Sequence, residues 1–452
     1  MTAQTPATPA IPATMKAVVM RAPGDVVVEE VDTPRVAQPT DVVLKLAAAC
    51  VCGSDLWPYR GHNDVDHRRM GHEYVGTIVE KGEDVATLEV GDFVIGSFML
   101  SDNTCEICQA GYQSRCVNAG EYTGSQAQYM RVELADGSLV KVPGGEPADP
   151  DRLADYLAAS DVLGTGWYAA VAAQAGPGKT IAVVGDGAVG LCAVLAAKTL
   201  GAEQVIVFSR HEDRAALARE FGADVVIAER GEEGAAQVRE LTGGYGAHGV
   251  CEAVGTQGSM DQALASVRPG GYVGFVGVSH DQTIDGSRLF GLEIHLEGGP
   301  APVRRFLPDL IDRILKREIN PGKVFTLRLP LEEAPEAYKA MEPNGRAFLK
   351  SAEYLPPVEE PDTEYPFFLT TGRLVHHFHT RTKTGRSAAL REAAARSLGI
   401  RPGARLACVT VVSPSASSAS YSNSPMPWVS PKNSGSATSM IRGLLSNVAT
   451  AA

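Results

Sequence analysis

The sequence predicts an α/β protein in which a mainly β segment precedes a doubly wound parallel sheet. From residue 180 to about residue 300, apolar runs typical of strands alternate with stretches of helical length. This alternation is the pattern of a parallel sheet built from β–α–β units. Before it, residues 15–142 hold short β-type runs separated by glycine-containing turns, and after residue 350 the composition changes again. We therefore expect two folded domains and a C-terminal extension.

The totals are those of a globular protein with more than one domain. The chain has 452 residues, 44% of them hydrophobic and 21% charged, with a formal net charge of -12. This charge argues against nucleic acid or an anionic membrane as a partner. The first 14 residues have neither the basic nor the apolar region of a secretory signal, and no apolar run is long enough to span a membrane. We expect a cytoplasmic protein whose cysteines serve as metal ligands or core thiols.

These patterns divide the chain into six segments. Residues 1–14 read as a disordered leader, residues 15–158 as the mainly β domain and residues 159–300 as the parallel-sheet domain. Residues 301–350 are expected to return to the first domain. Residues 351–408 differ in character, and residues 409–452 are rich in Ser, Ala and Pro, with too few large apolar side chains to form a core.

A glycine-rich turn follows the first strand of the alternating segment. Within IAVVGDGAVG, Gly185, Gly187 and Gly190 form a G-x-G-x-x-G pattern directly after a strand and at the start of a helix. Such glycines allow a tight turn and a close approach of the backbone to a pyrophosphate. A glycine turn without a ligand is the alternative. The strand, the helix and the next strand are all placed as a dinucleotide site requires, so we favour the cofactor.

The residues after the second strand indicate which dinucleotide binds. An acidic residue there would accept hydrogen bonds from the adenosine ribose of NAD. This chain instead has Ser209, Arg210 and Arg214, and a hydroxyl with guanidinium groups suits the 2′-phosphate of NADP. In the alternative, this is a solvated helix start where Glu212 and Asp213 pair with the arginines. We predict NADP in preference to NAD.

Cys52 and His72 are candidate zinc ligands in the β-rich segment, 20 residues apart. A thiolate and a neutral imidazole both bind zinc well, and a catalytic zinc site has three protein ligands and one open position. Each residue taken alone would read equally well as part of a core.

Several spaced motifs resemble those of zinc-containing medium-chain alcohol dehydrogenases. They are VCGSDL, MGHEYVGTIVEKGEDVATLEVGDFV and VVGDGAVG, and the resemblance runs from about residue 15 to residue 350. It implies a GroES-like catalytic domain and a Rossmann domain. It also implies reversible oxidation of a small-molecule alcohol to an aldehyde or ketone with zinc and NAD(P), by a homodimer or homotetramer.

The resemblance also implies a ligand set for the catalytic zinc. Cys52 and His72 match two ligands, and Glu73 lies beside the metal. Where many relatives have a third cysteine ligand this chain has Asp161, and relatives similar to formaldehyde and threonine dehydrogenases use an acidic ligand there. Asp55 matches the carboxylate that orients the ligand histidine through its other ring nitrogen.

Other family positions are matched less completely. Ser54 corresponds to the hydroxyl of the proton relay, although a backbone cap is the alternative. The next relay position is Trp57 rather than histidine. His62 is a possible substitute, but it also reads as an exposed loop residue. Thr165 and Val278 fall where relatives contact the nicotinamide and its ribose.

A second zinc site is implied by Cys105, Cys108 and Cys116. The family's structural lobe has four cysteines spaced C-x2-C-x2-C-x7-C, and the last three match. The first position is Asp102. Either Asp102 completes a tetrahedral site, or the lobe binds zinc weakly or not at all. We favour the Cys3Asp site.

Residues 352–386 resemble a different family. LTTGR and HFHTRTKTGR are similar to the opening of the C-terminal cofactor-binding domain of molybdopterin oxidoreductases. We interpret this fragment as the product of a gene fusion or a shifted reading frame, with little function of its own. Two alternatives for the whole chain remain: a molybdopterin-enzyme remnant or binding subunit with an inactive dehydrogenase core, and a zinc-free protein similar to quinone reductases.

Overall fold

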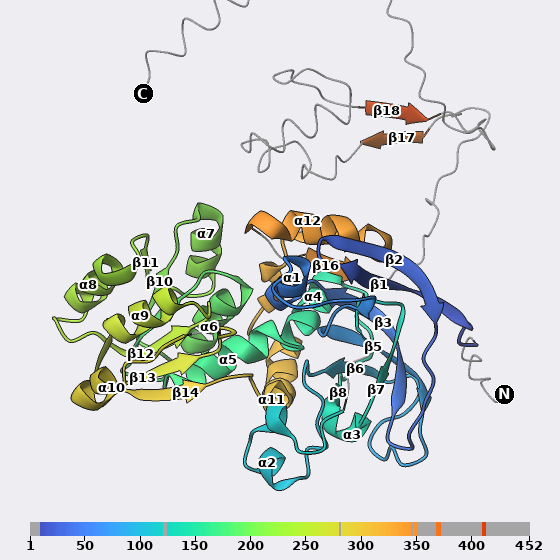
Figure 1. Ribbon diagram of the computed structural model, residues 1–452, viewed down its shortest axis with the longest axis horizontal. Helices are drawn as coiled ribbons and strands as arrows, with labels where there is room; N and C mark the ends of the chain where they lie inside the picture. Colours follow the sequence, from blue (N-terminus) through green and yellow to red (C-terminus); the bar gives the residue numbers. More distant parts are fainter. Residues whose placement is uncertain are drawn as a thin grey trace, which may run out of the picture. The chain divides into compact units, whose positions relative to one another are not determined.

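The computed structural model describes residues 10–120, 124–279, 282–344, 347–350, 368–371 and 409–412. The chain divides into two units, Met1–Glu353 and Tyr354–Ala452. The first unit holds every element from β1 to β16, including the β-rich part drawn in blue and the parallel sheet drawn in green to yellow (Figure 1). In the described part of the chain, no helix combines the length and apolarity needed to cross a bilayer.

The predicted parallel sheet is confirmed. Six strands lie in the order β11-β10-β9-β12-β13-β14, and every neighbouring pair is parallel. The middle strand β9 is an apolar run with four of its five residues buried, as expected for a strand covered on both faces. The strands are β9 (Thr180–Val184), β10 (Gln204–Phe208), β11 (Val225–Ile227), β12 (Ala247–Glu252), β13 (Val267–Phe275) and β14 (His295–Gly298).

Helices connect these strands in the predicted alternation. They are α6 (Ala188–Thr199), α7 (Glu212–Glu220), α8 (Gly231–Leu241), α9 (Gln257–Ser266) and α10 (Gly286–Leu292). The chain runs outward from β9 to β10 and β11, and then returns to β12 on the other side of β9. In open α/β sheets, ligands bind at the carboxyl ends of the strands where the order reverses, which here is at β9 and β12.

The β-rich part contains two further sheets. A seven-stranded sheet has the order β15-β16-β3-β5-β6-β8, with β7 also paired to β3, and a three-stranded sheet has the order β2-β1-β4. Their strands are β1 (Thr14–Ala22), β2 (Asp25–Asp32), β3 (Val42–Cys50), β4 (Arg68–Arg69), β5 (Tyr74–Lys81), β6 (Phe93–Gly96), β7 (Tyr129–Val132), β8 (Leu139–Lys141), β15 (Leu327–Pro330) and β16 (Ala347–Lys350).

The chain leaves the parallel sheet again and ends in strands of the β-rich part. After α11 (Val303–Leu315), the chain passes through η3 (Pro321–Val324), η4 (Leu331–Glu333) and α12 (Ala334–Asn344) to β16. Strand β16 pairs antiparallel with β3 and parallel with β15. The last strand of the sheet is thus formed before residue 351.

The elements that were not anticipated from the sequence include α4 (Pro150–Ala159), α10 and β14. The side chain of Asp149 caps the N-terminus of α4, and Pro150 occupies its first turn, which is a favourable start for a helix. Helix α4 is followed almost at once by α5 (Val162–Ala172). The junction between these two helices carries a residue of the candidate site.

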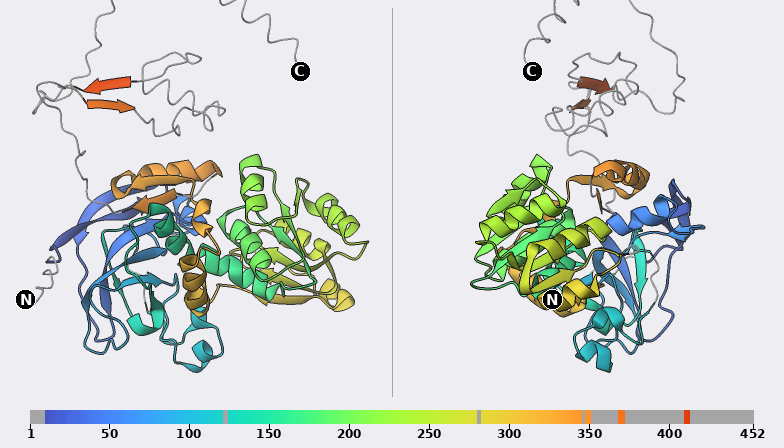
Figure 2. Two further views of the ribbon diagram at one scale, coloured as in Figure 1. Left: turned by 180° about the vertical axis from the view of Figure 1, so that it is seen from behind. Right: turned by 60° about the vertical axis from the view of Figure 1, so that its left-hand side comes forward.

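One hydrophobic cluster connects the two parts of the first unit. It includes Phe93 from the β-rich part, Trp167 from α5, Ile181 from β9 and Leu307 from α11. Figure 2 shows the β-rich part and the parallel sheet from two further directions. Because these core residues pack together, the candidate site at the junction is supported by both parts.

Asp155 of α4 gives the first testable consequence of this packing. Burial raises the pKa of Asp155 to about 6, although its Oδ1 accepts a hydrogen bond of 2.8 Å from the backbone N–H of Gly322. The folded protein therefore holds the proton more tightly than the unfolded chain does. The stabilisation that protonated Asp155 gives the folded protein is therefore present at acidic pH, and it is lost as the pH rises through about 6.

We expect Asp155→Asn to remove this pH dependence. At pH 7–8 the free energy of unfolding of the variant should exceed that of the wild type by roughly 1–3 kcal/mol, and the difference should vanish toward pH 4. Denaturant unfolding of both proteins at a series of pH values measures it. Asp151→Asn on the same helix, where the side chain is 79% exposed, is the matched control. Parallel stability curves for wild type and Asp155→Asn would contradict the expectation.

The second unit is described at only two short strands. Strands β17 (Phe368–Thr371) and β18 (Val409–Val412) pair antiparallel. The predicted molybdopterin-oxidoreductase-like fragment, residues 351–408, otherwise lies outside the described residues, as do residues 1–9 and 413–452. Strand β18 lies in the first four residues of the segment, residues 409–452, that was predicted to be a disordered tail.

Candidate active site

Sheet register explains why Cys52 and His72 meet. Cys52 follows the end of β3, and His72 precedes the start of β5. The two strands are antiparallel neighbours, with Ala49 opposite Tyr74. The end of β3 therefore lies beside the start of β5, which brings Cys52 and His72 to the same end of this strand pair. Gly71 has φ +95° there, and a side chain on it would come within 2.6 Å of the backbone nitrogen of Gln126. Only glycine fits before this histidine.

Asp161 reaches the same place from a distant part of the sequence. It occupies the junction between α4 and α5, where its backbone carbonyl accepts a hydrogen bond of 2.7 Å from Thr165 N. One ligand atom each from Cys52, His72, Glu73 and Asp161 lies within 4.8 Å of the others. The structure thus brings together the four residues that the resemblance implied at the catalytic metal.

The two ring nitrogens of His72 face different groups. Nε2 lies 3.4 Å from Asp161 Oδ2 and 3.9 Å from Glu73 Oε1, while Nδ1 lies 3.5 Å from Asp55 Oδ1. Nε2 therefore points into the four-residue cluster, and Nδ1 points to the carboxylate behind it. This is the arrangement in which a carboxylate fixes the tautomer of a metal-binding histidine.

Asp55 is itself held by a chain of hydrogen bonds. Its Oδ2 accepts from the backbone N–H of Cys52 at 2.9 Å and from Gln126 Nε2 at 3.0 Å. Gln126 Oε1 in turn accepts from the hydroxyl of Tyr338 at 2.9 Å. Burial raises the pKa of Tyr338 well above its ordinary value, so its hydroxyl remains a donor. Sequence reasoning missed Gln126 and Tyr338, because no motif marks either residue.

Asp161 is oriented by a neighbour on α5. The hydroxyl of Thr165 donates to Asp161 Oδ1 at 2.6 Å, while Oδ2 is the oxygen near His72 Nε2. Thr165 was expected to contact the cofactor. In the structure, its hydroxyl holds the carboxylate of Asp161, and its contact with a cofactor stays a prediction.

The cluster carries an excess of negative charge. Burial alone would lower the pKa of His72, but the Cys52 thiolate and the carboxylates of Asp55 and Asp161 outweigh burial and hold this pKa well above its ordinary value. The thiol, the two carboxyl groups and the imidazole of the cluster are groups that a divalent cation would satisfy better than a shared proton. The donor set of sulfur, nitrogen and oxygen suits zinc.

The residues considered for the proton relay are Ser54 and His62. Ser54 is half-buried in η1 (Gly53–Asp55), next to Cys52. The exposed ring of His62 lies against Trp57, with ring centroids 4.9 Å apart. His62 therefore fits the description of an exposed loop histidine that contacts its neighbour.

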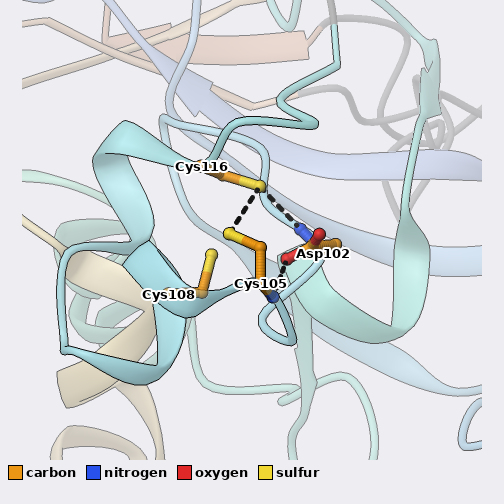
Figure 3. Close-up of side chains that lie close together, drawn as sticks. All are labelled: Asp102, Cys105, Cys108 and Cys116. Carbon is orange, nitrogen blue, oxygen red and sulfur yellow. Dashed lines mark hydrogen bonds between the residues drawn. The ribbon is translucent and has the colours of Figure 1, made fainter.

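The second predicted metal cluster also forms (Figure 3). Ligand atoms of Asp102, Cys105, Cys108 and Cys116 lie within 4.8 Å of one another. The sulfurs of Cys105 and Cys116 are 3.9 Å apart. Two thiolates bound to one zinc at about 2.3 Å in tetrahedral geometry lie about 3.8 Å apart. The spacing thus fits a tetrahedral site.

Backbone hydrogen bonds shape this lobe. Asp102 Oδ1 accepts from the N–H groups of Thr104 at 2.8 Å and Cys105 at 3.0 Å, and Oδ2 accepts from Asn118 Nδ2 at 2.7 Å. Burial opposes ionisation of Asp102, but these donors outweigh it and lower its pKa. The backbone N–H of Cys108 likewise lowers the pKa of the Cys105 thiol, whereas burial raises that of Cys108. The lobe thus combines an ionised carboxylate with a thiol, that of Cys105, whose pKa is lowered.

The three glycines of the G-x-G-x-x-G pattern differ in how strongly the fold requires them. Gly185 has φ +116°, and a side chain at Gly190 would come within 1.9 Å of the Gly185 carbonyl oxygen. The turn itself therefore requires both glycines. Gly187 has φ −73°, and a side chain there would meet no protein atom within 4 Å. The fold does not require glycine at 187, so the open space in front of it fits a bound ligand.

Gly187→Ala is expected to separate binding from folding. The added methyl should leave the free energy of unfolding within about 1 kcal/mol, because it touches no protein atom. It should weaken dinucleotide binding at least about tenfold, because it would occupy the space of the pyrophosphate. Nucleotide titration and thermal unfolding measure the two effects. Gly258→Ala, where a side chain also meets nothing within 4 Å, is the control, and unchanged binding by Gly187→Ala would contradict the expectation.

The residues predicted to choose the cofactor lie at the carboxyl end of β10. Ser209 is buried, and Arg210 is exposed. The guanidinium of Arg214 lies 3.1 Å from Asp186 Oδ1, and Glu212 instead pairs with Arg219 at 3.4 Å. Arg214 thus contacts Asp186, and Glu212 contacts Arg219.

Two exposed apolar side chains follow strands β12 and β13. Val278 is 57% exposed and Val254 is 45% exposed. A side chain on Gly255 would come within 2.0 Å of the carbonyl of Val278, and one on Gly185 within 2.9 Å of Val254 Cγ2. Val254 therefore lies beside the glycine turn, and Val278 lies beside Gly255, the residue that follows Val254.

Comparisons with known proteins agree with this geometry. The family model described as "Zinc-binding dehydrogenase" matches residues 188–315, and that described as "Alcohol dehydrogenase GroES-like domain" matches residues 38–144. A probable zinc-binding alcohol dehydrogenase of Mycobacterium tuberculosis is 37% identical over 333 residues, covering 72% of this chain and 84% of the relative. A zinc-type alcohol dehydrogenase B of Aspergillus flavus is 32% identical over 341 residues, covering 72% of this chain and 78% of the relative.

A solved structure shares the fold. Alcohol dehydrogenase TADH from Thermus sp. ATN1 is similar with a TM-score of 0.68 and 30% sequence identity, covering 74% of this chain and 99% of that chain. Both matched family ranges end before residue 351. The similarity therefore concerns the first unit.

Proposed function

This chain belongs to the zinc-binding medium-chain alcohol dehydrogenase family, and on that premise we propose that it moves hydride reversibly between an alcohol and NADP. NAD is the less favoured cofactor. The GroES-like domain and the Rossmann-like parallel sheet are those of the family. The observation that carries the proposal is the cluster of Cys52, His72, Glu73 and Asp161 at the junction of the two parts.

We assign the catalytic zinc to Cys52, His72 and Asp161. When bound, zinc acts as a Lewis acid that lowers the pKa of an alcohol, and the nicotinamide takes up hydride. Asp55 holds the Nδ1–H of His72, which leaves Nε2 free to face the metal, and Thr165 fixes the carboxylate of Asp161. These contacts pre-orient the ligands, so the site needs little rearrangement on metal binding.

Proton transfer is assigned to Ser54. Its hydroxyl can both accept and donate a proton, and it lies half-buried next to Cys52 and Asp55. Glu73 is fully buried beside the ligands and adds negative charge to the metal site. No histidine follows Ser54 in the relay position, because Trp57 occupies it.

A structural zinc is assigned to Asp102, Cys105, Cys108 and Cys116. The short thiolate spacing and the backbone donors support this assignment. The lobe is tied to the rest of the molecule, because the Ser114 hydroxyl donates to the carbonyl of Pro300 at 2.7 Å, just before α11. A metal here would hold the lobe against that helix.

The preference for NADP rests on Ser209, Arg210 and Arg214. Two guanidinium groups just after the second strand provide donors for a 2′-phosphate, and the Ser209 hydroxyl lies beside them. Gly185, Gly187 and Gly190 would leave room for the pyrophosphate, and we assign Val278 to the nicotinamide side of the site. The substrate is a small-molecule alcohol, aldehyde or ketone, and the protein is a cytoplasmic homodimer or homotetramer in this proposal.

The test uses the purified full-length chain. Metal analysis should find about two zinc ions per chain, and a panel of alcohols and aldehydes should be converted with NADP faster than with NAD. A clear preference for NAD would overturn the cofactor assignment. Molybdenum in place of zinc would favour the alternative of a molybdopterin-enzyme remnant, and full activity without zinc would favour a protein similar to quinone reductases.

A further inference from the structure

An acidic side chain, Asp186, lies in the glycine turn of the dinucleotide site. It stands between Gly185 and Gly187, and its side chain is only 9% exposed. Strands β9 and β10 are parallel neighbours with Val184 opposite Phe208, so Asp186 and Ser209 leave the sheet side by side. Helix α7 then brings Arg214 back toward the same point. The register of the sheet and the direction of α7 therefore bring Asp186, Ser209 and Arg214 together.

Both carboxylate oxygens of Asp186 are used. The hydroxyl of Ser209 donates to Oδ2 at 2.8 Å, and the guanidinium of Arg214 lies 3.1 Å from Oδ1. Ser209 is 5% exposed, and the Arg214 side chain is 25% exposed. A buried carboxylate therefore contacts two of the three residues assigned to the 2′-phosphate of NADP.

These contacts affect NADP and NAD in opposite ways. A hydroxyl has one proton to donate, and that of Ser209 is engaged by Asp186. A phosphate carries about −1.5 to −2 charges at neutral pH, so placing it beside Ser209 brings it close to a like charge. The 2′-hydroxyl of NAD brings no charge and can itself donate to a carboxylate, which is the role of the acidic residue usually found at the end of the second strand.

We propose that Asp186 is a specificity-determining residue that limits the preference for NADP and keeps NAD usable. The acidic residue that usually ends the second strand is here supplied from the glycine turn instead. Asp186 offsets one of the two positive charges of Arg210 and Arg214. This proposal rests on the proposed function only in that a dinucleotide binds at the glycine turn.

The test measures binding of NADPH and NADH to the full-length chain by fluorescence titration, without substrate. Asp186→Asn removes the charge but keeps the shape and an oxygen acceptor. We expect the ratio of the Kd for NADH to the Kd for NADPH to rise at least about tenfold. Glu212→Gln, on a side chain that is 89% exposed in the first turn of α7, is the matched control and should change the ratio less than about twofold.

Asp186→Ser is the second variant, in case the amide disturbs the turn. A ratio that stays within about twofold of wild type in both variants overturns the proposal. A ratio that falls also overturns it, because Asp186 would then organise the phosphate site by holding Arg214. If the wild-type chain binds neither nucleotide, the dinucleotide assignment fails instead. Adding salt should reduce the difference between wild type and Asp186→Asn, because the effect is one of charge.

Discussion

Cys52→Ser is expected to lower kcat/KM for alcohol oxidation at least about 10³-fold and to remove one zinc per chain. The Lewis acid supplies several kcal/mol of transition-state stabilisation, and about 4 kcal/mol corresponds to three orders of magnitude in rate. Serine is a much weaker zinc ligand than a thiolate at neutral pH. The loss should appear in kcat, because substrate contacts away from the metal remain.

Cys50→Ser provides the matched control for this experiment. Cys50 is equally buried and lies two residues earlier at the end of β3, but it is not in the four-residue cluster. This variant should keep both zinc ions and an activity within about threefold of wild type. If Cys52→Ser loses zinc but keeps its activity, the metal is not catalytic, and the zinc-free alternative becomes the better description.

Cys108→Ser is expected to cause the largest loss of stability. Structural zinc sites in small zinc-binding peptides have an apparent binding free energy of about 10–16 kcal/mol at neutral pH. Losing one of four ligands should therefore cost several kcal/mol and one zinc per chain. Because the Ser114 hydroxyl connects the lobe to the segment before α11, the loss should lower the Tm of the whole first unit. Calorimetry and metal analysis measure both effects.

Two further variants sharpen this second prediction. Cys251→Ser replaces a buried cysteine of β12 that lies in neither metal cluster, and it should keep both zinc ions. Asp102→Asn keeps an oxygen that can accept from Thr104 and Cys105, but it lacks the negative charge. If Asp102 binds zinc, this variant loses affinity for the structural metal. If Asp102 only caps the turn, its zinc content stays at the wild-type level, and the Cys3Asp assignment is wrong.

Much of the architecture was predictable because it is encoded locally. The strands and helices from β9 to β13 follow from short apolar runs separated by turn residues, and the structure confirms their order. In contrast, α4 was missed, although Asp149 and Pro150 form a recognisable helix start. The edge strand β14 was also missed, because four residues with two polar side chains carry little strand signal.

The sequence by itself also identified the residue types of the candidate site. The spacing of the cysteines, the Gly-His-Glu motif and the glycine turn are local patterns, so they can be recognised without coordinates. They determine that thiolates, an imidazole and a flexible turn are present. They do not determine which distant side chains surround them.

Those surroundings were decided by tertiary structure. Tyr338 reaches Asp55 through Gln126, across more than 200 residues of sequence, because α12 packs against the β-rich part. Asp186 contacts Ser209 because β9 and β10 are in register. The physical reason is the same in both cases. A hydrogen bond between segments depends on how sheets align and how helices return, and a local sequence pattern carries no information about that alignment.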